Sequence, residues 1–419
     1  MAVLFAPKAG GKGACALGAD KPCLPCEASW GDGLFRRAVL DRLATLGDGV
    51  LTIVDGRDCH VFGTGGELRA TVMVHRSRFY RRIALGGAIG AAESYMDGDW
   101  STEDLVAVLR LFARNAETSQ ELDRANPVVA AISKCTHWLR RNTKLNSRRN
   151  IAAHYDLGNE FFELFLDETR TYSCGFFESP TVTMRDASLA KINRLCRKLQ
   201  LTPDDHLVEI GTGWGALAIH AAENYGCRVT TTTISAKQHE YTERLIAERG
   251  LTHRITLVNV DYRDLSGQFD KLVSVEMIEA VGHEYLPTFF RKFRDLLKPG
   301  GRAAIQAITI RDEQYDRYRR SVDFIQKYIF PGGCLPSMGV MSKIVAQQTG
   351  LRISDREELR SHYAITLERW RDAFWKNIDR VRSLGLPDEF IRMWNWYFCY
   401  CEAAFREQQI GLSQIVLDK

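Results

Sequence analysis

Short apolar segments that alternate with helical segments dominate the second half of this chain. Five of them follow one another: LVEI (207–210), RVTTTTI (228–234), ITLVNV (255–260), KLVSVEMI (271–278) and GRAAIQAITI (301–310). Such alternation is typical of a parallel sheet covered by helices on both faces. The pattern therefore predicts an α/β fold, in which ligands bind at the carboxyl ends of the strands.

The first of these segments runs directly into a glycine-rich loop, GTGWG at 211–215. A dinucleotide site favours GxGxxG, and a phosphate-binding loop needs GK followed by Ser or Thr. The loop at 211–215 has neither pattern. An acid shortly before GxGxG is the arrangement found in S-adenosylmethionine-dependent methyltransferases, whose cofactor is cationic near the loop and carries no phosphate. We therefore expect the cofactor to contact Glu209, Gly211, Gly213, Trp214 and Gly215.

Further cofactor contacts are expected after the second and third strands. The second strand carries no acid that could bind the ribose hydroxyls. Thr233, Ser235 and Gln238 would supply hydrogen bonds in its place. Asp261 and Tyr262, in VDYRDL after the third strand, could contact the adenine.

The chain has 419 residues, which is too long for one ordinary core. Changes of pattern divide it into a tail that we expect to be disordered (1–30), a small α+β domain (31–115), a basic helical linker (116–150) and a methyltransferase domain (151–419) with a lid insertion at about 311–345. In the small domain, an amphipathic helix is predicted from Phe35 to Leu46 and a strand from Val50 to Val54.

Composition excludes several classes of function. The formal charge of +4 is too small to indicate nucleic acid binding. No apolar run approaches the ~20 residues that cross a bilayer, and we expect no secretion signal. The 11 cysteines are irregularly spaced, which favours free thiols in a reducing cytoplasm. Cys23 and Cys26 form a lone CxxC, and His283 and Glu284 lack a third ligand, so we expect no metal.

Two segments carry basic residues in a way that leaves alternatives open. The basic stretch Lys134–Asn150, which includes Trp138, has no acid. It is either a solvated linker or a patch that contacts an anionic membrane, where each cation adds roughly 1 kcal/mol. The segment Tyr318–Phe330 has apolar residues at helical spacing with Arg and Lys between them. It either packs on the core or forms a lid that lines an acyl chain and turns a basic face to headgroups.

Several segments, taken in order, resemble the cyclopropane-fatty-acyl-phospholipid synthases and their mycolic acid relatives. They are ESYMDGDW (93–100), YDLGNEFFELFLDETRTYSCGFF (155–177), VEIGTGWG (208–215), TISAKQ (233–238), SVEMIEAVGHE (274–284), YIFPGGCLPS (328–337), HYAITLERW (362–370) and YCEAAFR (400–406). Single segments occur in many methyltransferases, but the ordered set is specific. It implies a class I, Rossmann-like methyltransferase fold with a mostly parallel seven-stranded sheet and a helical lid, beside the small α+β domain.

The resemblance also implies a reaction. A methyl group passes from S-adenosylmethionine to a cis double bond in an unsaturated acyl chain of a phospholipid, and a cyclopropane ring closes. An alkene is a weak nucleophile, so it must be held in line with the methyl group and away from water. The resulting carbocation loses a proton to a base, which in this family is bicarbonate. We therefore expect a cytoplasmic enzyme, peripheral on the inner leaflet of the bilayer, and the resemblance allows a homodimer.

By the same resemblance, the bicarbonate site comprises Cys174, Glu279, the backbone of Ile308, and Tyr363. Gln306 stands where better-known members of the family have a histidine. An amide can donate and accept hydrogen bonds but cannot titrate. From the residues alone, Glu279 could instead be a surface acid, Tyr363 a packing aromatic and Gln306 a solvent-facing strand residue.

Three further residues are implied by the resemblance. Tyr172 and Ser173 are expected to contact the cofactor, and Cys401 matches a reactive cysteine near the lipid. Tyr172 and Cys401 could also be ordinary core side chains, since free cysteine is often buried.

Three other functions are weighed against ring formation. The cation could be resolved without ring closure, which gives a methylene-branched or, after reduction, a methyl-branched chain. The methyl acceptor could be a small amine. Finally, the chain could be a lipid-binding protein without catalysis, although the intact GTGWG, YSC, Glu279 and Tyr363 argue against that.

Overall fold

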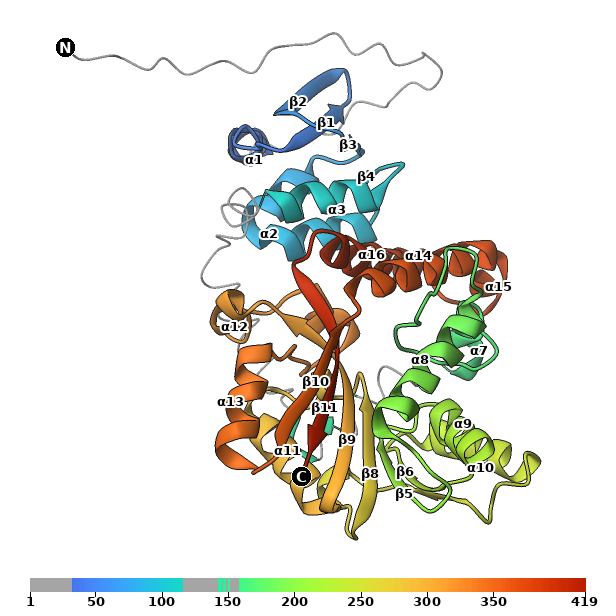
Figure 1. Ribbon diagram of the computed structural model, residues 1–419. Coiled ribbons are helices and arrows are strands. Elements are labelled where there is room, and N and C mark those ends of the chain that lie inside the picture. The colour runs from blue at the N-terminus through green and yellow to red at the C-terminus, as the bar shows by residue number, and fades with distance from the viewer. Residues whose placement is uncertain (1–31, 116–141, 145, 148–149, 151–157) are drawn as a thin grey trace, which may run out of the picture. The chain divides into compact units, whose positions relative to one another are not determined.

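The computed structural model describes residues 32–115, 142–144, 146–147, 150 and 158–419 (Figure 1). The expected disordered tail, Cys23, Cys26, Trp138 and most of the basic stretch lie outside these ranges. The chain divides into two compact units. The N-terminal unit comprises Met1–Ile132 and Leu386–Glu407, and the sheet unit comprises Ser133–Gly385 and Gln408–Lys419.

The N-terminal unit contains a small sheet in the strand order β2-β1-β3-β4. Strand β1 pairs antiparallel with β2 and parallel with β3. Its elements in chain order are α1 (Asp32–Leu43), β1 (Gly49–Asp55), β2 (Asp58–Gly65), β3 (Arg69–Val74), α2 (Arg78–Met96), β4 (Trp100–Ser101), α3 (Leu105–Arg114) and α16 (Asp388–Arg406). The predicted strand is present as β1, and the predicted helix is present as α1, which lies a few residues earlier than expected.

Helix α16 corrects the division of domains made from the sequence. That division placed all of 151–419 in one domain, whereas Leu386–Glu407 belongs to the N-terminal unit. The reason is aromatic packing: the ring of Trp396 lies 5.5 Å from that of Tyr95 and 6.0 Å from that of Trp100. Asn395 also donates a hydrogen bond to the Tyr95 hydroxyl at 2.8 Å.

The sheet unit is built on seven strands in the order β10-β11-β9-β8-β5-β6-β7. Strands β5 to β9 are parallel, as predicted, and β11 pairs antiparallel with β9 and with β10. The strands are β5 (His206–Ile210), β6 (Arg228–Thr232), β7 (Ile255–Val258), β8 (Phe269–Val275), β9 (Leu297–Ile310), β10 (Arg352–Glu358) and β11 (Ile410–Asp418). The fold class and the five predicted strands are thereby confirmed.

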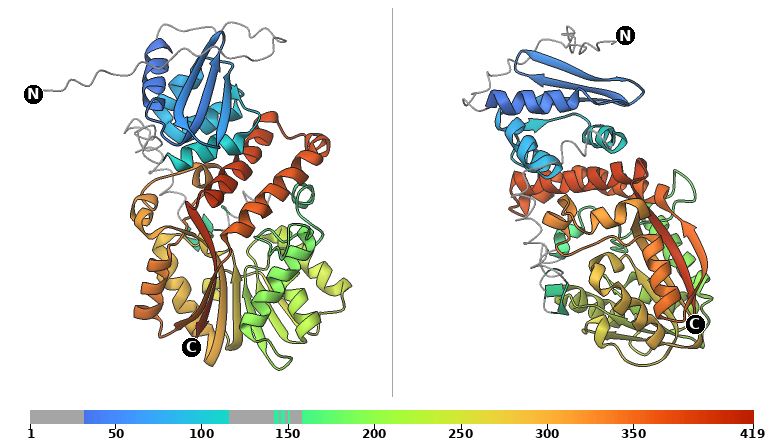
Figure 2. Two further views of the ribbon diagram at one scale, coloured as in Figure 1. Left: turned by 45° about the horizontal axis from the view of Figure 1, so that its top comes forward. Right: turned by 90° about the vertical axis from the view of Figure 1, so that its left-hand side faces the viewer.

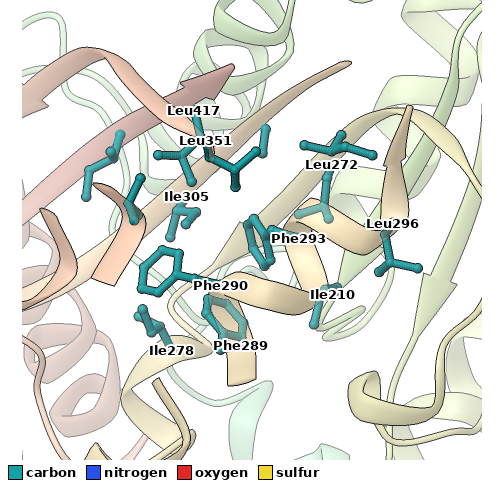
Figure 3. Packing of buried hydrophobic residues seen from close by; sticks show 14 of the residues in the cluster. Ile210, Leu272, Ile278, Phe289, Phe290, Phe293, Leu296, Ile305, Leu351 and Leu417 are labelled. Carbon is teal, nitrogen blue, oxygen red and sulfur yellow. The ribbon is translucent and has the colours of Figure 1, made fainter. Parts of the chain in front are cut away.

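Helices cover both faces of this sheet, as Figure 2 shows from two sides. The helices of this unit are α7 (Asn159–Phe162), α8 (Met184–Leu199), α9 (Ala216–Tyr225), α10 (Ala236–Glu248), α11 (Leu286–Leu296), α12 (Asp312–Tyr318), α13 (Met338–Gln348), α14 (Arg360–Lys376) and α15 (Ile378–Ser383). Helices α8 and α9 pack on one face, where Leu195 and Ala218 are buried. Helices α11 and α13 pack on the other, around Phe289, Phe290 and Phe293 (Figure 3). This core fixes the strand ends that carry the site.

The predicted helical lid is interrupted. Helix α12 ends at Tyr318, and a π-helix then spans Ile325–Ile329. Asp323 begins that second helix, because its carboxylate accepts the Gln326 amide at 2.8 Å while the Gln326 side chain accepts the Asp323 amide at 3.0 Å. This reciprocal capping breaks the continuous helix that the spacing from Tyr318 to Phe330 predicted.

The described helices were compared in length and hydropathy with a membrane-spanning helix. Within the described ranges, none is both long and apolar enough to cross a bilayer.

Candidate active site

The glycine loop between β5 and α9 requires residues that tolerate positive φ. Gly211, Gly213 and Gly215 have φ values of 104°, 54° and 89°. A Cβ atom at Gly215 would lie 2.7 Å from Cγ2 of the buried Thr242, whereas one at Gly213 would meet nothing within 4 Å. Gly215 is therefore needed for packing, and Gly213 leaves open space at the strand end.

The residues after β6 that are predicted to contact the cofactor are joined by hydrogen bonds to one another. Thr233 donates to the Gln238 side chain at 2.8 Å, and Ser235 caps α10 by accepting the Gln238 amide at 3.3 Å. Asp261 instead pairs with the Arg263 guanidinium at 2.7 Å, which helps to lower the pKa of Asp261. The buried hydroxyl of Tyr262 has no hydrogen-bond partner among the described residues. That hydroxyl is therefore available to a ligand.

Glu209 lies on β5 with its side chain in the interior. It accepts a hydrogen bond from Thr231 Oγ1 at 2.6 Å. Burial raises the pKa of Glu209 to about 8, although Thr231 and the ammonium of Lys191 act in the opposite direction. The Glu209 side chain is therefore mostly neutral at pH 7.

Glu209→Gln is expected to remove a pH-dependent loss of stability. Folding raises this carboxyl pKa from about 4.3 in the unfolded chain to about 8. Its contribution to stability is thus fully present below the unfolded pKa and is lost as the pH rises through about 8, at up to about 1.4 kcal/mol per pH unit. Urea unfolding at pH 5 and pH 8 measures this. The free energy of unfolding of the variant, relative to that of the native chain, should be higher at pH 8 than at pH 5. An equal difference at both pH values would contradict the assignment.

The centre of the site is a carboxylate that follows β8. Glu276 Oε1 accepts hydrogen bonds from the Cys174 amide at 2.9 Å and from Gln306 Nε2 at 2.7 Å. Glu276 Oε2 accepts one from the Tyr363 hydroxyl at 2.6 Å. Removal from water raises the pKa of Glu276, and these hydrogen bonds and the ammonium of Lys191 oppose that rise.

A second carboxylate, that of Glu279, lies beside the first. Its Oε1 accepts the Ile308 amide at 2.5 Å. Its Oε2 is shielded from solvent and has no hydrogen-bond partner among the described residues. Burial and the neighbouring charge of Glu276 raise the pKa of Glu279 to about 8, so Glu279 is mostly protonated at neutral pH.

Two other buried groups complete the polar centre. Lys191, on α8, donates from Nζ to the Ser173 hydroxyl at 2.8 Å. Burial lowers the pKa of Lys191, and the charge of Glu276 is the largest influence that opposes this. Cys174 is fully buried, which raises the pKa of its thiol well above the ordinary value. Cys174 therefore contributes its backbone amide, and its thiol stays neutral.

Aromatic rings connect the glycine loop to this centre. The ring of Phe162 lies 5.2 Å from that of Trp214 and 5.4 Å from that of Tyr172. Trp370 continues the series, at 5.2 Å from Tyr172 and 6.3 Å from Tyr363. Trp214 is oriented by a hydrogen bond to Asn159 at 2.9 Å. This series of ring contacts makes one side of the site largely apolar.

Comparison with known proteins identifies the family. The family model described as mycolic acid cyclopropane synthetase matches residues 142–415. The chain belongs to this family. It is 41% identical to the tuberculostearic acid methyltransferase UfaA1 of Mycobacterium tuberculosis over 374 residues, which cover 85% of this chain and 84% of that protein. It is 33% identical to the cyclopropane-fatty-acyl-phospholipid synthase of Escherichia coli K12 over 363 residues, which cover 84% and 89%.

A solved structure agrees with these matches. The structure of mycolic acid cyclopropane synthase CmaA1 complexed with SAH and CTAB superposes with a TM-score of 0.60 at 31% identity, and covers 65% of this chain and 98% of that one. The chain is therefore an S-adenosylmethionine-dependent methyltransferase of the cyclopropane synthase family, which transfers methyl or methylene groups to lipid acyl chains.

The structure gathers most of the residues that the family resemblance singled out. Cys174, Gln306 and Tyr363 bind the Glu276 carboxylate, and the Ile308 backbone binds the neighbouring Glu279, where Gln306 is fully buried and not solvent-facing. Their catalytic roles, and those of the cofactor contacts, stay predictions. Cys401 lies on α16 in the N-terminal unit and is half-buried. Its role near the lipid stays a prediction.

Two charged residues of the polar centre, Glu276 and Lys191, were not singled out from the sequence. Glu276 lies inside the quoted segment SVEMIEAVGHE, directly after a strand of a parallel sheet, which is a position that indicates function. Lys191 is a cation on the buried side of α8, in register with the buried residues Ala187 and Leu195. A charge on an apolar helix face is a signal that the sequence did contain.

Proposed function

We propose that this chain transfers the methyl group of S-adenosylmethionine to a cis double bond in an unsaturated acyl chain of a phospholipid, and that the product forms when the resulting cation loses a proton. The observation that carries the proposal is the hydrogen-bonded carboxylate of Glu276, beside the glycine loop. A Cβ atom at Gly211 would lie 3.4 Å from Met277, the residue that follows Glu276. Methyl donor and proton acceptor would thus occupy neighbouring positions.

The chain's own residues suit this chemistry in two ways. The rings of Trp214, Phe162, Tyr172 and Trp370 form a series of contacts that starts in the glycine loop, and they would exclude water from a carbocation on the acyl chain. The neighbouring thiol of Cys174 is kept protonated by burial, so it is a poor competitor for the methyl group. The cofactor, when bound, supplies a methyl group on a cationic sulfur.

Ring closure is the first product that we propose. The family model is described by it, and the relative in Escherichia coli is named for it. A second candidate is a methylene- or methyl-branched chain. It is supported by the higher identity, 41%, to a relative whose name describes a methyl transfer to form tuberculostearic acid. Both products require the same methyl addition.

The experiment combines purified protein with vesicles of a dioleoyl phospholipid and S-adenosylmethionine that carries a CD3 group. The acyl chains are then released as methyl esters for gas chromatography, mass spectrometry and proton NMR. Both candidates predict acyl chains heavier by one CD2 unit. The NMR sample comes from a parallel reaction with unlabelled S-adenosylmethionine, because a transferred CD2 group carries no protons. Ring closure then removes the olefinic protons and adds upfield ring protons, whereas the methylene product shows the protons of a =CH2 group within the chain. Absence of label in the acyl chains would refute the proposed function.

We also propose that the protein binds its substrate at an anionic phospholipid surface. Support comes from the basic stretch, although Lys144, its basic residue within the described ranges, is paired with Asp264. The same assay tests this with neutral and anionic vesicles at low and high salt. Activity on anionic vesicles should fall with salt, and equal activity on both vesicle types at low salt would refute the electrostatic contribution. A homodimer stays a prediction.

A further inference from the structure

We propose that Glu276 is the catalytic base of this enzyme and takes the place in which the family resemblance predicted bicarbonate. The inference rests on the proposed methyl transfer and adds to it the identity of the proton acceptor. Its starting point is that Glu276 receives hydrogen bonds from Cys174 and Tyr363, which the resemblance assigned to bicarbonate, and from Gln306, which stands in place of the family's histidine.

The donors in the centre are already engaged by carboxylates of the chain. The amide of Ile308, the remaining backbone donor assigned to bicarbonate, binds Glu279 at 2.5 Å. A free bicarbonate ion would have to take the donors that bind Glu276 while lying beside this carboxylate, at a cost in charge repulsion. The residues present therefore do not fit bicarbonate, and they do fit a carboxylate supplied by the chain itself.

Gln306 is oriented so that its amide donates a hydrogen bond to a carboxylate. Its Oε1 accepts a hydrogen bond from Gln414 at 2.9 Å, and its Nε2 donates to Glu276 at 2.7 Å. Both glutamines are fully buried. Because an amide cannot change its charge, Gln306 donates to Glu276 at every pH. The glutamine found in place of the family's histidine thus serves as a permanent hydrogen-bond donor to Glu276.

The backbone at Glu276 also indicates a function. Its φ is 48°, in the left-handed region that costs an ordinary residue about 1–2 kcal/mol. Its amide donates to the Gln306 carbonyl at 2.8 Å, which holds the turn after β8 in place. Strained positions of this kind gather at active sites. Glycine would relieve the strain, so a Glu276→Gly variant is expected to fold.

The neighbouring charges favour an ionised Glu276 beside a neutral Glu279. Lys191 and the three hydrogen-bond donors oppose the rise that burial causes in the pKa of Glu276. The pKa of Glu279 is raised to about 8, partly by Glu276 itself. Two adjacent carboxyl groups in unequal surroundings divide the roles, so that one is the base and the other stays protonated.

The proton transfer then balances without a further reactant. The π electrons of the alkene form the new bond to the methyl carbon, and the electron pair of the broken carbon–sulfur bond stays on S-adenosylhomocysteine. One proton of the attached methyl group passes to a Glu276 oxygen. Its former C–H electron pair closes the ring, or forms a double bond after a hydride shift. The available acceptor is Oε2, because two hydrogen bonds occupy Oε1 and only the Tyr363 hydroxyl binds Oε2 among the described residues.

The first test uses the native chain. Its rate of methyl transfer to dioleoyl vesicles is measured in rigorously CO2-free buffer and again with added bicarbonate. Equal rates are expected. Stimulation of tenfold or more by bicarbonate would overturn the inference while leaving the proposed function intact. The two failures are distinguishable because the proposed function fails only if the native chain labels no acyl chain under either condition.

The second test uses two substitutions at one position. Glu276→Gln keeps the shape and removes the base, and its rate should fall at least 100-fold while binding of S-adenosylhomocysteine, measured by calorimetry, is retained. Glu276→Gly frees the donors of Cys174, Gln306 and Tyr363. Added bicarbonate or formate should then raise the rate of this variant at least tenfold. A native rate for the glutamine variant would overturn the inference. So would the absence of rescue in a glycine variant that melts at the native temperature.

Discussion

Gly215→Ala is expected to lower the free energy of unfolding by about 2–5 kcal/mol and to abolish measurable cofactor binding. The alanine would have to adopt a φ of 89°, which costs about 1–2 kcal/mol. Its Cβ would lie 2.7 Å from Cγ2 of Thr242, which is completely buried on α10, and such overpacking costs about 1–3 kcal/mol. Urea unfolding and calorimetric titration with S-adenosylhomocysteine measure the two effects.

The same loop offers matched controls. Gly213→Ala also has a positive φ but meets no atom within 4 Å, so stability should change by only about 1 kcal/mol. Its added methyl group would lie in the space expected for the cofactor, so binding should still weaken. Thr242→Ser removes Cγ2 and keeps the hydroxyl, and should therefore recover part of the stability lost in Gly215→Ala. Additive effects of these two changes would refute the clash.

Lys191→Met is expected to slow methyl transfer about 10- to 100-fold at pH 7 and to move the acid limb of the pH–rate profile to higher pH. Lys191 is a buried cation whose charge opposes the rise in the pKa of Glu276. Without it that pKa rises further, so less of the carboxylate is ionised and able to accept a proton at pH 7. Each pH unit of displacement lowers the rate on the acid limb about tenfold. The measurement is the initial rate of label transfer from pH 6 to pH 9.

The control for this substitution lies on the same helix. Lys198 pairs with Glu357 at 3.1 Å at the far end of α8. Lys198→Met should therefore change the rate less than twofold and leave the pH profile in place. If Lys191→Met lowered the rate equally at every pH, Lys191 would be a packing residue and not a positioning residue for Glu276.

The sequence alone was sufficient for the parts of the fold that local pattern encodes. Apolar segments that alternate with helices predicted β5 to β9 in their parallel arrangement. The glycines at 211, 213 and 215 predicted a loop that approaches a ligand, because their positive φ values are open to few other residues. The sequence did not predict the break at Asp323 in the lid, since capping by Gln326 depends on a turn whose side chains face each other only after folding.

What the sequence by itself determined about this protein is therefore the sheet, the glycine loop and the membership of a lipid-modifying methyltransferase family. Only the tertiary structure decided that α16 packs with the N-terminal unit and that Glu276 lies at the centre of the site. The physical reason is separation along the chain. Glu276 is 102 residues from Cys174 and 87 from Tyr363. No local periodicity records which distant donors meet a carboxylate once the strands and helices have packed.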